Sequence, residues 1–378
     1  MQNIFKKFFD KNLAFIKPVA GSAVGIDIGA SAIKVVEIKR KDGKAVLGTY
    51  GSLALGPYAD LSVGAVTNVS PEIIAQALKD VLHESGITIG SAGIAMPSAS
   101  SLIFLIDVPA VVTDEELPTI VPTEARKYIP VPVSEVTLDY SLIPRRASAK
   151  PTTPNTLQTQ RIEMEVEKSE VLVVAVNNDT IEKYTDIAKK AQVNPTFLEI
   201  EVFSSIRSSF GHNKETVLMV DMGASKTKLT IVENSIVRNF HVVNRGGFDI
   251  TNALANALAI PFEKAEQLKR EHGLYGTSGD ARSAEVIKAS MDYIISEIKT
   301  VVYTYEKKYN QTLSQVIFTG GGALTKGFLE YAKTAFSTEV VCALPFEKVT
   351  APAFLAPVLS SSGPEFSVAL GIALRGLE

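Results

Sequence analysis

The chain alternates between short runs of β-branched and other apolar residues and longer stretches with helical periodicity, which predicts a mixed α/β fold. Residues 71–85 illustrate the helical signal: Ser70 is an N-cap residue, Pro71 takes the first helical position, and Gly86 follows the last periodic residue. Strands are expected at 23–28, 33–39, 45–50, 92–96, 102–108, 136–143, 161–168, 170–176, 217–221, 228–233, 236–243 and 316–318. Helices are expected at 71–85, 113–128, 180–192, 248–259, 262–272 and 284–309.

Residues 1–18 form a separate amphipathic unit that Pro18 ends. Its charged residues fall on one half of a helical wheel, and the other half holds Ile4, Phe5, Phe8, Phe9, Leu13, Phe15 and Ile16. Such a helix suits the headgroup layer of a membrane. It also suits a helix packed on its own globular body or on a partner protein. Both interpretations stay open, and the packed helix is favoured because one amphipathic segment is a common pattern.

Residues 98–192 differ from the rest of the chain in their pattern of apolar and polar residues, which predicts a small α+β insert. The helix expected at 113–128 contains Pro118 and Pro122, which makes its extent uncertain. Residues 144–160 are rich in Pro, Thr, Ser and Ala without apolar periodicity, which predicts a loop between two strands.

Composition removes several classes of function. The 378 residues, 46% hydrophobic and 21% charged, indicate a globular protein of two or three domains. A formal charge of −3 argues against binding to nucleic acid. The single cysteine, Cys342, excludes an internal disulfide, and the four histidines lack the spacing of a zinc site. No apolar run approaches the ~20 residues of a membrane-spanning helix, and the start does not resemble a cleavable signal peptide.

The strongest signal is an internal repeat. Residues 26–31 (Ile-Asp-Ile-Gly-Ala-Ser) match residues 220–225 (Val-Asp-Met-Gly-Ala-Ser), and Lys34 and Lys228 stand three residues further on. Each copy follows a predicted buried strand and leads into a second strand. Two such units in separate halves of the chain predict two similar domains that face each other.

The chemistry that such a turn supports is phosphate binding. Small residues let backbone N–H groups approach phosphate oxygens, and a hydroxyl adds a donor. Asp27 and Asp221, at the strand ends, are expected to hold Mg²⁺ through water. Lys34 and Lys226 are candidates for neutralising phosphate. The candidate contacts from the two turns are Asp27, Gly29, Ala30, Ser31, Lys34, Asp221, Gly223, Ala224, Ser225, Lys226 and Thr227. A single copy is weak because Asp and Gly are common turn residues, whereas two copies favour a nucleotide site.

A glycine-rich loop follows the strand predicted at 316–318. Gly320, Gly321 and Gly322 stand between that strand and a helix expected to begin near Thr325. Such a loop allows a flat ring to lie against the backbone. Lys326 is a further candidate contact.

In their order and separation, the two turns and the glycine loop resemble those of the actin-like ATPase superfamily. The resemblance implies an actin-like, ribonuclease-H-like two-domain ATPase fold and ATP with Mg²⁺ as the ligand. It also implies base and ribose contacts at Gly246, Gly247 and Asp249, and at Glu266 and Lys269. The closing helix of the first domain is expected at 366–374.

The insert resembles the SHS2-type subdomain shared by FtsA and PilM, on residues 114–116, 128–130 and 135–142. The run Glu-Ala-Arg-Lys-Tyr-Ile-Pro at 124–130 is similar to PilM. FtsA proteins end in a linker and an amphipathic membrane helix, whereas this sequence stops directly after its last core helix. We therefore expect a member of the PilM family, with an SHS2-type α+β insert in the first domain.

The PilM resemblance implies a cytoplasmic ATP-binding component of type IV pilus or related secretion machinery, held at the inner membrane through partner proteins. The implied partner is the cytoplasmic N-terminal peptide of a PilN-like membrane protein, bound in a groove at the first domain and its insert, with nucleotide state regulating the groove. Leu102, Phe104 and Ile106 are candidates for lining it, or are ordinary core residues. The implied subdomains are 1–21 (N-terminal helix), 22–97 with 193–212 and 365–378 (1A), 98–192 (1C), 213–260 with 315–364 (2A) and 261–314 (2B).

Binding and hydrolysis need separate arguments. Hydrolysis requires a group that orients the attacking water, and no Gln, His or Glu in a recognisable motif stands between the two turns. Asp27 is a candidate base, although its position suits a metal-bound water better. We therefore expect slow turnover of ATP or none.

Two alternatives remain open. One is an FtsA-like cell-division filament protein that self-associates and contacts the membrane through residues 1–18. The other is a small-molecule kinase of the same superfamily, for which no suitable catalytic Asp stands out between Asp42 and Asp107.

Overall fold

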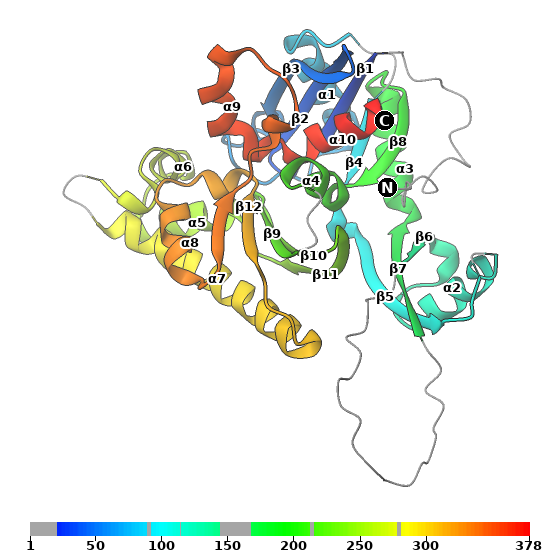
Figure 1. Ribbon diagram of the computed structural model, residues 1–378. Helices are drawn as coiled ribbons and strands as arrows, with labels where there is room; N and C mark the ends of the chain where they lie inside the picture. Colours follow the sequence, from blue (N-terminus) through cyan, green and yellow to red (C-terminus); the bar gives the residue numbers. More distant parts are fainter. Residues whose placement is uncertain (1–20, 89–91, 114, 144–167, 212–214, 278–280) are drawn as a thin grey trace, which may run out of the picture.

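The computed structural model describes residues 21–88, 92–113, 115–143, 168–211, 215–277 and 281–378, which form three sheets with helices packed around them (Figure 1). The predicted N-terminal helix at 1–18, the loop at 144–160 and most of the strand at 161–168 lie outside these ranges. Short 3-10 turns occur at Gly56–Ala59, Ser98–Ser100, Val133–Glu135, Gly273–Tyr275, Gly321–Leu324, Pro345–Lys348, Ala353–Leu355 and Gly363–Phe366.

The first sheet has the order β3-β2-β1-β4-β8. Its strands are β1 (Ser22–Ile28), β2 (Ala32–Lys41), β3 (Lys44–Ala54), β4 (Ala92–Met96) and β8 (Pro195–Ile200). Helices cover both faces, as expected for central strands that are apolar on both sides. Ile26, Ile33 and Val35 pack beneath α1 (Pro71–Glu84) and α3 (Asn178–Lys190). Val36 and Ile38 face α10 (Ser367–Leu377) on the other side.

The second sheet repeats this arrangement with the order β11-β10-β9-β12-β13. Its strands are β9 (Thr216–Met222), β10 (Thr227–Glu233), β11 (Ile236–Val243), β12 (Gln315–Thr319) and β13 (Glu339–Cys342). Its helices are α5 (Gly247–Leu258), α6 (Phe262–Glu271), α7 (Arg282–Tyr309) and α8 (Phe328–Ala335). The helix α9 (Ala356–Ser362) packs instead on the first sheet's side, where Leu359 joins the core cluster of Val36 and Ile38. In the first sheet, the central strand β1 pairs antiparallel with β2 and parallel with β4. In the second sheet, the central strand β9 pairs in the same way with β10 and β12. The sequence repeat is therefore also a repeat of topology.

The third sheet lies at the lower right of Figure 1 and has the antiparallel order β5-β7-β6. Its elements are β5 (Ser101–Pro109), β6 (Val136–Leu142), β7 (Lys168–Asn177) and α2 (Leu117–Ala125). The helix α2 is shorter than the predicted 113–128. Pro118 lies in its first turn, where a missing N–H costs little, and Pro122 lies inside it. The third sheet and α2 together form a small α+β unit.

The C-terminal helix α10 packs closely on α4 (Glu201–Ser209). A Cβ atom at Gly371 would lie 1.9 Å from the Ser204 carbonyl oxygen, so only glycine permits this approach. The buried Glu199 accepts hydrogen bonds from Arg207 on α4 and Arg375 on α10. The closing helix is thereby fixed where expected. Within the described ranges, no helix combines the length and apolar character needed to span a bilayer.

Candidate functional site

A cavity of about 620 Å³ lies between the first and second sheets. This volume falls within the usual range of small-molecule sites. Most of the residues that the sequence nominated line it: Asp27, Gly29, Ala30, Ser31, Lys34, Asp221, Gly223, Ala224, Ser225, Lys226, Gly247, Glu266, Lys269, Gly320, Gly321 and Gly322. The fold thus brings together segments from both halves of the chain.

The two repeated turns have matching backbone geometry. Gly29 N–H donates to the Ala32 carbonyl at 3.0 Å, and Gly223 N–H donates to the Lys226 carbonyl at the same distance. In the strand pairs behind them, the aspartate of each copy is in register with its lysine, Asp27 with Lys34 and Asp221 with Lys228. Both turns open toward the cavity.

The glycine loop closes on the second turn. Gly320 has φ +81°, and a Cβ atom there would lie 2.5 Å from Asp221 Oδ1 and 2.6 Å from the Met222 carbonyl oxygen. Only glycine fits both the left-handed backbone and this approach. The helix expected near Thr325 begins later: a 3-10 turn at Gly321–Leu324 comes first, and α8 starts at Phe328.

Asp27 is a buried carboxylate, 8% exposed, that lines the cavity. Burial raises the pKa of Asp27 from 3.8 to about 6, although Lys34 acts in the opposite direction. Among the described residues, nothing donates a hydrogen bond to its carboxylate. A buried, incompletely solvated carboxylate of this kind is suited to a hydrated divalent cation.

Glu201, which the sequence analysis missed, joins the site from the first residue of α4. Its Oε1 accepts hydrogen bonds from Ser98 N–H at 2.8 Å and from the Ser98 hydroxyl at 2.7 Å. Its Oε2 accepts from Lys228 Nζ at 2.7 Å, and the same ammonium lies 3.1 Å from Asp221 Oδ2. Burial lowers the pKa of Lys228, but Asp221 and Glu201 outweigh it and hold this pKa well above its ordinary value. The available sequence signal was an acidic residue at the first position of a helix that follows a strand directly.

Glu266 and Lys269 form a second buried cluster on the opposite wall. Lys269 Nζ donates to Glu266 Oε2 and the Thr251 hydroxyl, both at 2.7 Å, and to the Gly247 carbonyl at 3.0 Å. Glu266 also accepts from the Thr251 hydroxyl at 2.5 Å and from Arg270 Nε at 2.6 Å. Burial lowers the pKa of Lys269 despite Glu266. The three ammonium donors are all used within the protein.

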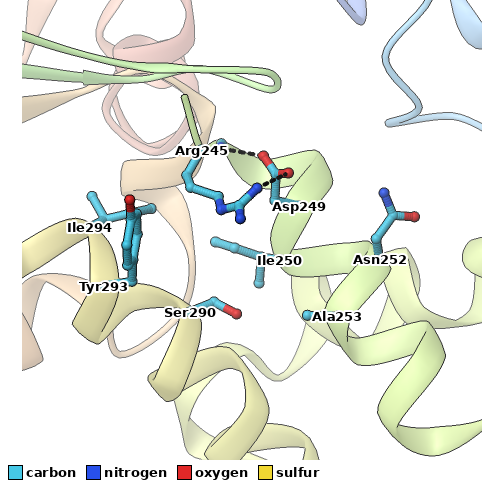
Figure 2. Close-up of a pocket in the computed structure, with 9 residues that line it drawn as sticks. Arg245, Asp249, Ile250, Asn252, Ala253, Ser290, Tyr293 and Ile294 are labelled. Atoms are coloured by element: carbon cyan, nitrogen blue, oxygen red, sulfur yellow. Dashed lines mark hydrogen bonds and ion pairs between the residues drawn. The ribbon is translucent and has the colours of Figure 1, made fainter. Parts of the chain in front are cut away.

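Four nominated residues do not line this cavity: Thr227, Gly246, Asp249 and Lys326. The Thr227 hydroxyl is buried and donates to the Arg245 carbonyl at 2.9 Å. Gly246 and Asp249 line a smaller pocket of about 260 Å³ between α5 and α7, where Asp249 pairs with Arg245 (Figure 2). The Lys326 carbonyl accepts from Leu274 N–H, which turns this segment toward the 3-10 turn at Gly273–Tyr275.

The oxygen donors fit a metal held through water better than one held directly. In the part of the chain that the structure describes, no group of three or more His, Cys, Asp or Glu side chains is placed to hold a metal ion. Asp27 and Asp221 instead stand at the ends of the two facing strands and both line the cavity.

Comparisons with known proteins agree with this fold. The family model described as type IV pilus assembly protein PilM matches residues 25–377. The structure is similar to that of a PilM-PilN type IV pilus biogenesis complex, with a TM-score of 0.77 and 25% identity, covering 94% of this chain and 98% of that one.

More distant relatives share the architecture. A MamK double helical filament matches with a TM-score of 0.53 and 14% identity, covering 94% of this chain and 99% of that one, which shows the actin-like fold alone. The cell division protein FtsA of Streptococcus pneumoniae serotype 2 (strain D39 / NCTC 7466) is 22% identical over 375 residues, 90% of this chain and 79% of its own length. The predicted actin-like fold is confirmed, and with the family model spanning nearly the whole sequence, the chain belongs to the PilM family of type IV pilus assembly proteins.

Proposed function

We propose that this chain binds MgATP in the cavity between its two sheets and serves as the nucleotide-dependent cytoplasmic component of a type IV pilus or related secretion machine. One observation carries the proposal: two matching strand–turn–strand units and a glycine loop, far apart in the sequence, converge on one cavity of about 620 Å³. Backbone N–H groups of such turns can donate hydrogen bonds to phosphate oxygens.

The acidic and basic residues around the cavity have different proposed roles. Asp27 and Asp221 would hold Mg²⁺ through water, and the metal would neutralise charge on the phosphates when bound. Lys34 and Lys226 line the cavity and form no ion pair with any described residue, so their ammonium groups are available to phosphate oxygens. Glu201 has both carboxylate oxygens engaged. This agrees with slow turnover of the nucleotide.

The partner that we propose is the N-terminal cytoplasmic peptide of a PilN-like inner-membrane protein, which would also place the chain at that membrane. Support comes from the similarity to a PilM-PilN complex and from one apolar face of the third sheet. On that face Leu102 is 37% exposed, and Phe104 stacks on the exposed Tyr128 ring at 5.0 Å between centroids. Ile106, also nominated, is 2% exposed and belongs to the core beneath α2.

Ion pairs of the buried Arg238 connect the third sheet to the second sheet. Arg238 of β11 lies 2.5 Å from Glu170 of β7 and 2.9 Å from Glu233 of β10. The side chain of Arg238 is 2% exposed, so breaking these pairs is costly. A shift of the second sheet on nucleotide binding would therefore be transmitted to the third sheet.

The nucleotide site is tested by isothermal titration with MgATP. The wild type is expected to bind saturably, and Asp221→Ala is expected to abolish binding. Lys226→Ala should raise Kd by about tenfold, because it removes a charge-assisted contact. Lys326→Ala is the matched control, since this lysine lies outside the cavity, and it should bind like the wild type. A folded, nucleotide-free wild type that does not bind MgATP would reject the proposal.

The partner is tested by titrating the N-terminal peptide of the PilN homologue from the same organism, with and without MgATP. Leu102→Asp should weaken peptide binding, because it places a charge on the apolar surface. Val111→Asp is the control: Val111 is 82% exposed and follows the opposite end of β5. Equal loss in both variants would reject the assigned surface.

A further inference from the structure

The segment between β3 and α1 contains a strap, residues 56–67, whose two ends are hydrogen-bonded to the first repeated turn at Ala30 and Ser31. Just before it, Leu55 N–H donates to the Ser31 carbonyl at 2.8 Å. At its far end, Thr67 donates to the Ala30 carbonyl through its N–H at 3.0 Å and its hydroxyl at 3.3 Å. The strap therefore leaves and returns at the same phosphate-binding turn.

The strap holds a defined shape. Leu61 N–H donates to the Gly56 carbonyl at 2.9 Å, and Ala65 N–H donates to the Ser62 carbonyl at 3.1 Å. The first bond closes the 3-10 turn Gly56–Ala59, and the second forms a tight turn at 62–65. Gly64 adopts φ +89°, a left-handed conformation that glycine reaches without strain. The strap presents one fixed tip rather than an extended loop.

The tip meets the opposite wall of the cavity. A Cβ atom at Gly64 would lie 2.6 Å from Cδ and 2.7 Å from Oε1 of Glu266, on α6 in the other half of the chain. Glu266 is held by hydrogen bonds from Thr251, Lys269 and Arg270 and is 6% exposed, so its carboxylate has little room to retreat. Gly64 and Glu266 both line the cavity, and their contact thus lies at its border.

We propose that the strap is a clasp over the nucleotide cavity, and that contact between Gly64 and Glu266 limits the release of bound nucleotide. The clasp rests on the proposed MgATP site. It joins the phosphate-binding turn of the first half to α6 of the second half, so the two halves cannot separate around a nucleotide while it is seated. Seating requires a residue without Cβ at position 64, because any side chain would meet the fixed Glu266.

The test compares Gly64→Ala with Gly43→Ala. Gly43 lies in the β2–β3 turn with φ +74°, and a Cβ atom there has nothing within 4 Å. Both substitutions place alanine in a left-handed conformation, but only the one at position 64 collides with the opposite wall. The measurement is the dissociation rate of a fluorescent ATP analogue with Mg²⁺, chased with excess ATP in a stopped-flow instrument. Gly64→Ala should release it about tenfold faster or more, and Gly43→Ala should stay close to the wild type.

Each result decides between outcomes. Wild-type binding with equal release rates for the two variants overturns the clasp and leaves the nucleotide site standing. Absence of wild-type binding rejects the nucleotide site. The clasp is then judged without ligand by amide hydrogen exchange at Leu61, Ala65 and Thr67. Faster exchange in Gly64→Ala than in Gly43→Ala supports seating of the strap on Glu266, and equal exchange overturns it.

Discussion

Replacing Asp27 with asparagine should stabilise the nucleotide-free protein while weakening its binding of MgATP. Burial raises the pKa of Asp27 from 3.8 to about 6 in the folded protein, because the charged carboxylate loses water and Lys34 compensates only in part. Folding at neutral pH therefore carries the cost of burying this charge. An amide of the same shape avoids that cost.

The sign and size follow from proton linkage. Because the folded pKa lies above the unfolded one, the folded state holds a proton between about pH 4 and 6 that the unfolded chain has released. The stability that the protonated Asp27 contributes is fully present below the unfolded pKa of 3.8 and is lost as the pH rises through about 6. A displacement from 3.8 to about 6 corresponds to about 3 kcal/mol. Asp27→Asn should gain up to about 3 kcal/mol at pH 7.5 and about half of that at pH 5.

Urea unfolding of the nucleotide-free protein at pH 7.5 and pH 5 measures this difference. Asp42→Asn is the control, since Asp42 is exposed in the β2–β3 turn with φ 51°, where asparagine is well accommodated. Added MgATP should stabilise the wild type more than Asp27→Asn, because ligand stabilises in proportion to its affinity. A variant that is no more stable than the wild type at pH 7.5, or whose gain does not shrink at pH 5, would refute the assignment of a costly buried charge.

Two further variants probe the buried ion clusters. Lys228→Met should destabilise the fold by about 3–5 kcal/mol in urea unfolding, since it leaves Asp221 and Glu201 buried together. Adding Glu201→Gln should restore part of this, and a double variant no more stable than the single one would count against the shared cation. Burial raises the pKa of Glu199, but Arg207 outweighs it and the pKa is lowered. Stability from this pair is therefore lost as the pH falls through that lowered value. Glu199→Gln should flatten the acid side of the thermal stability profile, and an unchanged profile would contradict it.

The parts of the site that the sequence predicted are those encoded by neighbouring residues. The two turns, each with its aspartate and downstream lysine, are visible because a turn and its flanking strands are local in the chain. Glu201 was missed because its role depends on Ser98, which is distant in sequence. The strap was missed because Gly64 has no motif of its own: its contact with Glu266 exists only once the two halves have folded. Lys326 does not line the cavity, and Gly327, with φ +77°, turns the chain just after it, before α8 begins.

The two copies of the repeat share a sequence motif but differ in the ion pairs that their lysines form. Lys34 and Lys228 occupy equivalent positions in register with their aspartates. Yet Lys228 lies 3.1 Å from Asp221 and is held in place by Glu201, whereas Lys34 forms no ion pair with any described residue. The repeated motif sets equal backbone geometry at the two turns, and a third carboxylate from α4 makes their charges unequal. Burial raises the pKa of Asp27 although Lys34 opposes it, so a cation bound at the first turn would relieve an electrostatic cost there.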